Sequence, residues 1–265
     1  MSDLKVMTVQ SELAWENPEA NRRNLEELIG TNSEDVDLIV LPEMFTTGFT
    51  MAPAKHAEAM SDDMPTLQWM RKLAASRQAV VTGTVSVSDR GGFFNRIFWV
   101  DPEGTLQTAD KRHLFTLGKE HEHYSPGESR LIAEVKGWWV NPMCCYDLRF
   151  PAWCRNTLQN GRPDYDLQIF MANWPQKRTH HWDALLVARA IENQSWVIGV
   201  NITGEDGNGV AHVGHSAVYS PAGECTNRHA DSTQGVLVTT LSRESLEQTR
   251  RTLSFLKDQD RFTIE

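Results

Sequence analysis

The sequence contains no apolar run that approaches the roughly 18 residues needed for a membrane-spanning helix. Its first residues have neither the charged segment nor the apolar segment of a secretory signal. Basic residues are also scarce, since 26 Lys and Arg stand against 35 Asp and Glu, for a net charge of −9. Because an acidic chain repels nucleic acid and anionic membranes, we expect neither as a partner. We predict a cytoplasmic protein.

Cysteine is scarce too, and no two cysteines have the Cys-x-x-Cys spacing of zinc ribbons or thioredoxin-like sites. Two histidine pairs, at positions 121 and 123 and at 180 and 181, lack partner ligands at recognisable spacing. We therefore expect no metal site, and free thiols in a reducing compartment. The four cysteines are Cys144, Cys145, Cys154 and Cys225.

What the chain does have is an alternation of strand-like and helix-like segments along 265 residues, with no linker, internal repeat or low-complexity stretch. We predict strands over 4–10, 37–41, 79–87, 93–100, 131–135, 138–144, 167–172, 196–202, 217–220 and 235–241. We predict helices over 18–30, 66–76, 151–158, 181–192 and 242–252. Helices mixed with strands and hairpins indicate one α/β domain, residues 1–265, with a mixed sheet or sheets.

Three segments place an ionisable or nucleophilic residue at the end of an apolar run, where the active sites of open α/β sheets are often assembled. Glu43 follows the strand 37–41, Lys111 follows a short strand, and Cys145 follows the strand 138–144. Taken singly, each has a simpler interpretation: a solvated Glu in a loop, a charged turn, and a packed cysteine. The three segments indicate an active site only when they are taken together.

The segment around Cys145 combines a strand, a sharp turn and a helix start, which is the geometry that exposes a nucleophile above a sheet edge. Backbone N–H groups at such a turn can stabilise both a thiolate and an oxyanion. The charged residues that follow at once, Asp147 and Arg149, weaken the interpretation of Cys145 as an ordinary core residue.

The three segments, in this order, resemble the motifs of the nitrilase, or carbon–nitrogen hydrolase, superfamily. Leu-Pro-Glu at 41–43 resembles its glutamate motif, Lys-Arg-His-Leu-Phe at 111–115 its lysine motif, and Cys-Tyr-Asp-Leu-Arg-Phe-Pro at 145–151 its nucleophile motif. The resemblance covers nearly the whole chain. It implies a four-layer α-β-β-α sandwich and association into homodimers or larger homo-oligomers.

The resemblance also implies a second glutamate between the lysine and the cysteine. Alignment on Ser-Pro-Gly at 125–127 assigns this position to Glu120, with Glu122 as the nearest alternative. Of the two adjacent cysteines, Cys145 is the implied nucleophile because Tyr-Asp-Leu-Arg follows it. Strand alternation points the two side chains to opposite faces, so we expect Cys144 in the core.

For the chemistry, the resemblance implies attack by Cys145 on an amide carbon, with no metal or organic cofactor. A free thiol is mostly protonated at neutral pH, so a base or cation must favour the thiolate. Glu43 would take the proton, return it to the leaving nitrogen and then activate the water that hydrolyses the thioester. Lys111 and the backbone N–H of Tyr146 would hold the oxyanion, and Glu120 would orient Lys111 or the water.

Among the branches of the superfamily, the chain is most similar to the bacterial omega-amidases, which hydrolyse the terminal amide of 2-oxoglutaramate or 2-oxosuccinamate. The segments that carry this resemblance are 44–49, 172–175 and 206–209. We expect Phe45 and Trp174 to wall a small pocket. A 2-oxo acid also needs a cation for its carboxylate, and the guanidinium of Arg149 or Arg112 suits that geometry.

Two other functions stay open. One is a related amidase that acts on deaminated glutathione, an N-carbamoyl compound or an aliphatic amide. The other is a catalytically weak scaffold that uses the fold for association. The presence of Glu43, Lys111 and Cys145 together argues against the scaffold.

Overall fold

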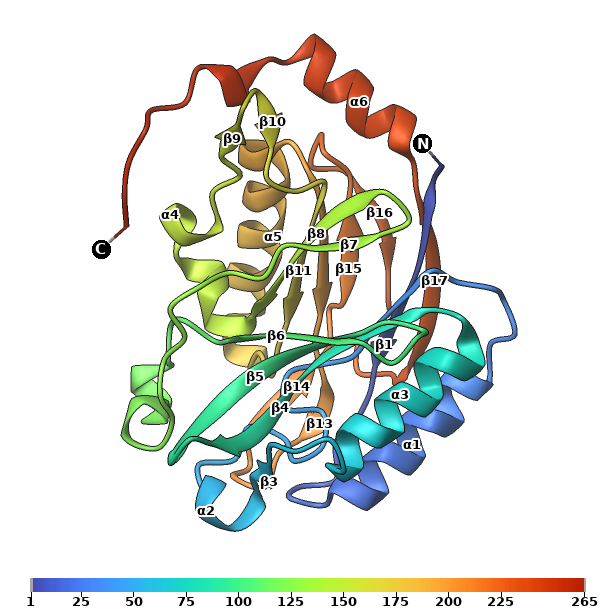
Figure 1. Ribbon diagram of the computed structural model, residues 1–265, viewed down its shortest axis with the longest axis vertical. Helices are drawn as coiled ribbons and strands as arrows, with labels where there is room; N and C mark the ends of the chain where they lie inside the picture. Colours follow the sequence, from blue (N-terminus) through green and yellow to red (C-terminus); the bar gives the residue numbers. More distant parts are fainter. Residues whose placement is uncertain (1, 265) are drawn as a thin grey trace.

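The computed structural model describes residues 2–264 as two β-sheets packed face to face, with helices on the outer sides (Figure 1). The first sheet has the order β17-β1-β2-β4-β5-β6, with β3 paired to β4, and the second has the order β16-β15-β12-β11-β8-β7. The strands of the first sheet are β1 (Leu4–Gln10), β2 (Leu38–Val40), β3 (Glu58–Ala59), β4 (Val80–Asp89), β5 (Gly92–Val100), β6 (Leu106–Asp110) and β17 (Gly235–Leu241). Those of the second are β7 (Ala133–Val135), β8 (Trp138–Cys144), β11 (Leu167–Met171), β12 (Trp196–Val200), β15 (Ala217–Tyr219) and β16 (Cys225–Arg228).

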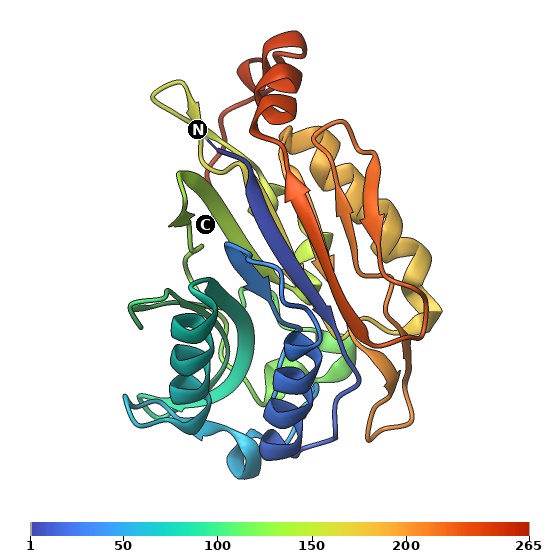
Figure 2. The same ribbon diagram turned by 90° about the vertical axis from the view of Figure 1, so that its right-hand side faces the viewer.

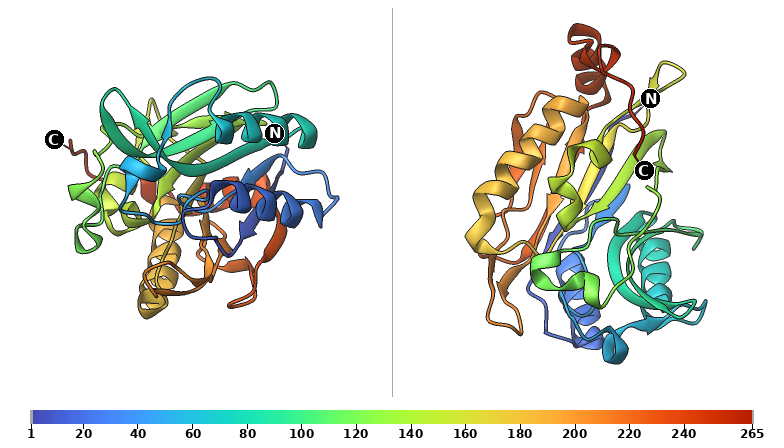
Figure 3. Two further views of the ribbon diagram at one scale, coloured as in Figure 1. Left: turned by 90° about the horizontal axis from the view of Figure 1, so that it is seen from below. Right: turned by 90° about the vertical axis from the view of Figure 1, so that its left-hand side faces the viewer.

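Three long helices form the two outer layers. Helices α1 (Pro18–Gly30) and α3 (Pro65–Arg77) cover the first sheet, and α5 (Thr179–Asn193) covers the second. Figure 2 and the right-hand panel of Figure 3 show the sheets edge-on between these helices. The predicted α-β-β-α sandwich is therefore confirmed.

The alternation of apolar residues along the strands explains the layering. In β1, Leu4 and Val6 point between the two sheets, whereas Met7 and Val9 point toward α1 and α3. Both sheets contribute to the layer between them, because Ile169 of β11 belongs to the same buried cluster as Leu4 and Val6. β1 is accordingly buried on both faces except at Lys5, and its polar residues Thr8 and Gln10 are buried as well.

One predicted element is wrong in extent. The helix expected over 151–158 ends as α4 (Pro151–Cys154), and the chain then enters β9 (Leu158–Gln159). The amide of Asn156 accounts for the early end, because it donates to the backbone oxygens of Tyr165 and Asn193, at 2.9 and 3.0 Å. A side chain that bonds distant backbone in this way competes with helix continuation.

The remaining elements are short, apart from α6 near the end of the chain. They are α2 (Pro53–His56), β10 (Arg162–Pro163), β13 (Thr203–Glu205), β14 (Ala211–Val213), α6 (Arg243–Thr252) and the 3₁₀ turn η5 (Phe255–Lys257). Across residues 2–264, no helix combines the length and apolar character needed to cross a bilayer.

Candidate active site

Cys145 lies at a sharp turn between β8 and the 3₁₀ helix η3 (Cys145–Arg149). Its backbone has φ +39°, a left-handed conformation that is uncommon for a residue with a side chain. The carboxylate of Asp147 stabilises the turn: Oδ2 accepts from the N–H of Cys144 at 3.3 Å, and Oδ1 accepts from the N–H of His113 at 3.0 Å. The sharp turn predicted at this position is present, and Asp147 is a residue that sequence reasoning gave no structural role.

A buried ion cluster lies beside this turn. Glu43 follows β2, Lys111 follows β6, and Glu120 opens the 3₁₀ helix η2 (Glu120–Glu122). Lys111 Nζ lies 2.8 Å from Glu43 Oε1 and 3.0 and 2.9 Å from the two carboxylate oxygens of Glu120. All three side chains are buried, so their charges are compensated by one another and by hydrogen bonds rather than by water.

Glu122, the alternative to Glu120, does not reach this cluster. Its carboxylate lies on the surface, 4.0 Å from the ammonium of Lys119. Glu120 also accepts from the backbone N–H of Phe115 at 2.6 Å, which fixes the segment between Lys111 and η2. The structure thus brings Glu120, and not Glu122, into contact with Lys111.

Asn95, on β5, is a member of the site that sequence reasoning missed. Its Nδ2 donates to Glu43 Oε1 at 2.9 Å and to Glu120 Oε1 at 3.3 Å. Its Oδ1 accepts from the hydroxyl of Thr84 at 2.7 Å, which fixes the orientation of the amide. No local motif announces this role, because Asn95 lies mid-strand and meets the two glutamates only through the packing of β5.

The two carboxylates have pKa values that move in opposite directions. Burial raises the pKa of Glu43, but the charge and hydrogen bond of Lys111, with further donors, outweigh it and lower the pKa below its usual value. For Glu120, burial and the charge of Glu43 prevail over Lys111 and raise the pKa. Because the two pKa values move apart, Glu43 loses its proton more readily than Glu120.

The thiol of Cys145 is held in its neutral form. Burial, and then the negative charge of Glu43, raise the pKa of Cys145 well above its usual value, against the opposing charge of Lys111. The pKa of Lys111 is itself raised, because Glu120 and Glu43 outweigh the effect of burial. The arrangement therefore suits removal of the Cys145 proton by Glu43 during attack, rather than a standing thiolate.

Cys144 departs from the expectation. It is buried as predicted, yet its Sγ lies 3.1 Å from Glu43 Oε1, so it contacts a carboxylate of the buried ion cluster. The alternation argument assumed a continued strand, but the chain leaves the strand conformation at Cys145, with φ +39°. Burial, and then the charge of Glu43, raise the pKa of both thiols.

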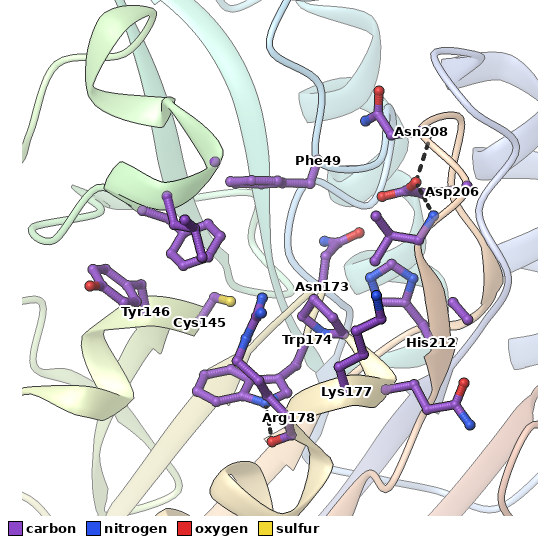
Figure 4. A pocket seen from close by; sticks show the side chains of 18 of the residues that line it. Phe49, Cys145, Tyr146, Asn173, Trp174, Lys177, Arg178, Asp206, Asn208 and His212 are labelled. Carbon is purple, nitrogen blue, oxygen red and sulfur yellow. Dashed lines mark hydrogen bonds between the residues drawn. The ribbon is translucent and has the colours of Figure 1, made fainter.

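Cys145 opens into a pocket of about 580 Å³. Figure 4 shows Cys145 and Tyr146 on one side of this pocket and Asp206 and His212 on the opposite side. The loop between β13 and β14 forms that opposite side, with the carboxylate of Asp206 accepting from the N–H of Asn208 at 2.8 Å.

The predicted pocket residues divide into two groups. Tyr146, Arg149 and Trp174 line the pocket, and the guanidinium of Arg149 lies 4.5 Å from the ring centroid of Trp174. The structure does not bring Phe45 or Arg112 to the lining.

Phe45 is buried between β4 and α3, 5.8 Å from the ring centroid of Trp69, and this position corrects its assignment as a pocket wall. Met44 turns the chain with φ +43°, and Phe49, four residues beyond Phe45, reaches the pocket instead. Arg112 donates to the oxygen of Gly127 at 3.1 Å and so points away from the pocket.

Several lining residues were not predicted from the sequence to line a pocket. They are Phe49, Phe115, Leu117, Lys177, Arg178 and His212. Arg178 ends the 3₁₀ helix η4 (Gln176–Arg178), and its guanidinium lies 5.4 Å from the ring centroid of Phe115. Phe115 precedes the 3₁₀ helix η1 (Thr116–Gly118), so residues distant in the chain meet at this wall. Within residues 2–264 no group of three or more His, Cys, Asp or Glu is placed to hold a metal ion.

Comparison with known proteins agrees with this geometry. The model of the carbon–nitrogen hydrolase family matches residues 5–251, and the chain belongs to that family. It is 42% identical to the omega-amidase YafV of Escherichia coli K12 over 266 residues, which covers 100% of both chains. It is 33% identical to a 2-oxoglutaramate amidase of Bacillus subtilis, over 82% of this chain and 83% of the relative.

A solved structure is also similar over its whole length. XC1258 of Xanthomonas campestris, a CN-hydrolase superfamily protein with an arsenic adduct in its active site, superposes with a TM-score of 0.97 at 41% identity, covering 100% of both chains. The predicted membership of the nitrilase superfamily is thereby confirmed, and with it the class of enzyme, a carbon–nitrogen hydrolase.

Proposed function

We propose that this enzyme hydrolyses the terminal amide of small 2-oxo dicarboxylic acid monoamides, such as 2-oxoglutaramate and 2-oxosuccinamate, to the acid and ammonia. The observation that carries this proposal is a pair of guanidinium groups, Arg149 and Arg178, in the pocket that Cys145 opens into. Among residues 2–264, the contacts of these two guanidiniums are with the rings of Trp174 and Phe115 and with His181, and none is an ion pair with a carboxylate. A short 2-oxo acid monoamide has its carboxylate at one end and its amide at the other, which matches cations and a thiol in one pocket.

The electrostatics of the two arginines support an anionic ligand. Burial, and then the positive charge of Arg178, lower the pKa of Arg149. The ring nitrogen Nδ1 of His181, 3.3 Å from both terminal nitrogens of Arg149, supplies no negative charge. A bound carboxylate would relieve the repulsion between the guanidiniums, and planar guanidinium groups suit carboxylate oxygens well.

In the proposed mechanism, Glu43 takes the proton of Cys145 as the sulfur attacks the amide carbon. The resulting oxyanion is held by Lys111 and by the backbone N–H of Tyr146, in the first turn of η3, where helical N–H groups have no partner within the helix. Glu43 then gives its proton to the leaving nitrogen, ammonia departs and a thioester on Cys145 remains.

The second half of the proposed reaction uses the same groups. Glu43 removes a proton from water as the water attacks the thioester, the C–S bond then breaks to release the acid, and Glu43 returns the proton to the sulfur of Cys145. Glu120 orients Lys111 throughout, a role supported by the two contacts between its carboxylate and Lys111 Nζ at 3.0 and 2.9 Å. Orientation of a buried ammonium before substrate arrives avoids reorganisation during the reaction.

The test is ammonia release from 2-oxoglutaramate and 2-oxosuccinamate by wild type, Cys145→Ala and, as a matched control, Cys225→Ala. Cys225 is exposed and lies on β16, outside the pocket. We expect release by wild type and the control and none by Cys145→Ala. Release that survives Cys145→Ala would contradict the nucleophile assignment, and absence of release by wild type would contradict the substrate assignment.

A screen of other amides separates the remaining substrates. N-carbamoyl compounds and aliphatic amides should be hydrolysed far more slowly than the 2-oxo acid monoamides, because they do not place a carboxylate and a 2-oxo group opposite the amide. Deaminated glutathione has the same 2-oxo acid end but a dipeptide on its amide nitrogen, so it should be hydrolysed more slowly only if the pocket has no room for the larger leaving group. A non-catalytic scaffold would show no hydrolysis at all. Its Cys145 would react with iodoacetamide no faster than the exposed Cys225.

Two further sequence predictions belong to the proposal. We propose a homodimer, which light scattering coupled to size-exclusion chromatography measures directly. A cytoplasmic location also stays a prediction, and fractionation of cells that express the chain checks it.

A further inference from the structure

Cys144 is a nucleophilic group for which the proposed mechanism has no use. Its side chain is fully buried, and it does not line the pocket, so it cannot meet the substrate. Its Sγ nevertheless lies 3.1 Å from Glu43 Oε1. An ionised carboxylate only accepts hydrogen bonds, so the thiol is the donor in this contact.

The carboxylate of Glu43 is held from several directions at once. Oε1 accepts from Lys111 Nζ at 2.8 Å, from Asn95 Nδ2 at 2.9 Å and from Cys144 Sγ at 3.1 Å. Oε2 accepts from the backbone N–H of Asn173 at 2.8 Å. Each of these donors favours the ionised form of the carboxylate and restricts its rotation.

We infer that Cys144 is a positioning residue, whose thiol fixes the orientation of the Glu43 carboxylate and sets how readily that carboxylate accepts the proton of Cys145. The inference rests on the proposed role of Glu43 as general base. The two adjacent cysteines then have different roles: Cys145 bonds to the substrate, and Cys144 orients the Glu43 carboxylate that takes the proton of Cys145.

The protonation of Cys144 suits a permanent donor. Burial, and then the charge of Glu43, raise the pKa of Cys144 well above its usual value, so the thiol keeps its proton across the neutral range. The charge of Lys111 opposes this effect, while Cys145 and Asp147 add to it. A neutral thiol beside a carboxylate is a weak donor, but it is directed and excluded from water.

The pH dependence expected of Glu43 depends on every titratable group around it. These groups are Lys111 after β6, Glu120 on η2, Tyr124, Cys144 on β8, Cys145 on η3 and His212 on β14. Among them, Lys111 and Cys144 donate hydrogen bonds to Glu43 that lower its pKa, against the effect of burial. Removal of the Cys144 donor should therefore raise the pKa of Glu43.

The experiment is the pH profile of kcat/KM for 2-oxoglutaramate in Cys144→Ala. Because Glu43 acts as a base only when ionised, a raised pKa moves the acid limb of the profile to higher pH. We expect a shift of about one pH unit and a fall of about 10-fold in kcat on the plateau. The serine hydroxyl is also a donor, so Cys144→Ser should return the acid limb most of the way to wild type.

The matched control is Cys154→Ala. Cys154 is also a fully buried thiol, but its Sγ lies 3.2 Å from the backbone oxygen of Asp147 and not from Glu43. Cys154→Ala therefore removes the same atom from the interior without removal of a donor to the base. We expect its acid limb to coincide with that of wild type.

Labelling of Cys145 by iodoacetamide, followed by mass spectrometry, gives a second measurement that needs no amide substrate. The same proton must leave Cys145, so the acid limb of the labelling rate should move in Cys144→Ala and stay in Cys154→Ala. If wild type hydrolyses no 2-oxo acid monoamide, the proposed function fails while this measurement still stands. Equal acid limbs in Cys144→Ala and Cys154→Ala, or a shift in Cys144→Ser as large as in Cys144→Ala, would overturn the inference.

Discussion

The charges around Glu43 and the charges around Arg149 belong to one site, but the first are paired with one another and the second are not. In the buried network of Glu43, Asn95, Lys111 and Glu120, the charged and amide groups bond to one another at 2.8–3.3 Å. On the pocket wall, Arg149 and its neighbour on η4 lie against aromatic rings and have no carboxylate partner among residues 2–264.

This difference separates two tasks. The buried network is complete before any ligand arrives, so its interactions act on the rate of the chemical step. The cations of the pocket wall gain a partner only when a ligand binds, so they act on affinity. Substitutions in the network should therefore lower kcat, and substitutions on the wall should raise KM. Each prediction below tests this separation.

The largest effect is expected from Lys111→Met. It removes the only ammonium among residues 2–264 that contacts Glu43 and Glu120 and leaves two buried carboxylates without their cation. Loss of the partner of a buried charge typically costs about 3–5 kcal/mol of stability. The loss of an oxyanion donor should lower kcat by about 10³-fold. Urea unfolding and steady-state kinetics measure the two effects.

A double variant separates these two losses. Lys111→Met combined with Glu120→Gln removes one of the uncompensated carboxylates, so part of the lost stability should return. The rate should not return, because no donor replaces the ammonium. A double variant that regains activity would show that Lys111 is structural, and the division between the two regions would fail.

The second prediction concerns Arg178→Ala on the pocket wall. We expect kcat/KM for 2-oxoglutaramate to fall by about 100-fold, mostly through KM, since a charge-assisted bond to a carboxylate is lost. Arg178 is not part of the core, so the midpoint of thermal unfolding should stay close to that of wild type. Hydrolysis of an uncharged amide is the control, and an equal loss there would mean that the arginine does not bind carboxylate.

A smaller effect is expected from Asn95→Ala. The amide donates to both glutamates, at 2.9 and 3.3 Å, and loss of one buried hydrogen-bonding group costs about 1–3 kcal/mol. We expect kcat to fall by about 10-fold with KM unchanged, because Asn95 is part of the buried network. A change confined to KM would place the residue with the wall and break the comparison.

The smallest effect is expected from Arg112→Ala. Its guanidinium is bound to the oxygen of Gly127 at 3.1 Å and lies 5.5 Å from the ring centroid of Trp153, away from the pocket. We expect kcat/KM to change by less than about 2-fold, within the range of surface substitutions.

Arg149→Ala, in the same assay, should raise KM as Arg178→Ala does.

The buried network was largely predictable from the sequence, because each member except Asn95 lies in or near a segment that resembles a motif of the carbon–nitrogen hydrolase family. Lys111 and Cys145 directly follow strands, Glu43 lies shortly after β2, and Glu120 was assigned through the family resemblance, by alignment on the Ser-Pro-Gly segment at 125–127. A residue at a strand end is carried to the sheet edge whatever the rest of the chain does. Asn95 has no such marker, since its contacts depend on which strands become neighbours of β5.

The residues of the pocket wall were predicted poorly, and the wrong and missed predictions have a common cause. Phe45 and Phe49 are four residues apart, and the turn at Met44, with φ +43°, decides which of them enters the core. Arg178 meets Phe115 only because η4 and η1, from distant parts of the chain, converge on one side of the sandwich. Such choices depend on tertiary packing, and a single sequence does not contain a local signal for them.

The left-handed backbone of Cys145 has a consequence for protein engineering. A residue with a side chain adopts φ +39° at a steric cost that glycine does not have, so Cys145 lowers the free energy of unfolding at the position where catalysis needs a thiol. Cys145→Gly should therefore be an inactive enzyme with a native or raised melting temperature. Any programme that selects variants of this chain for heat resistance alone will drift toward loss of its nucleophile.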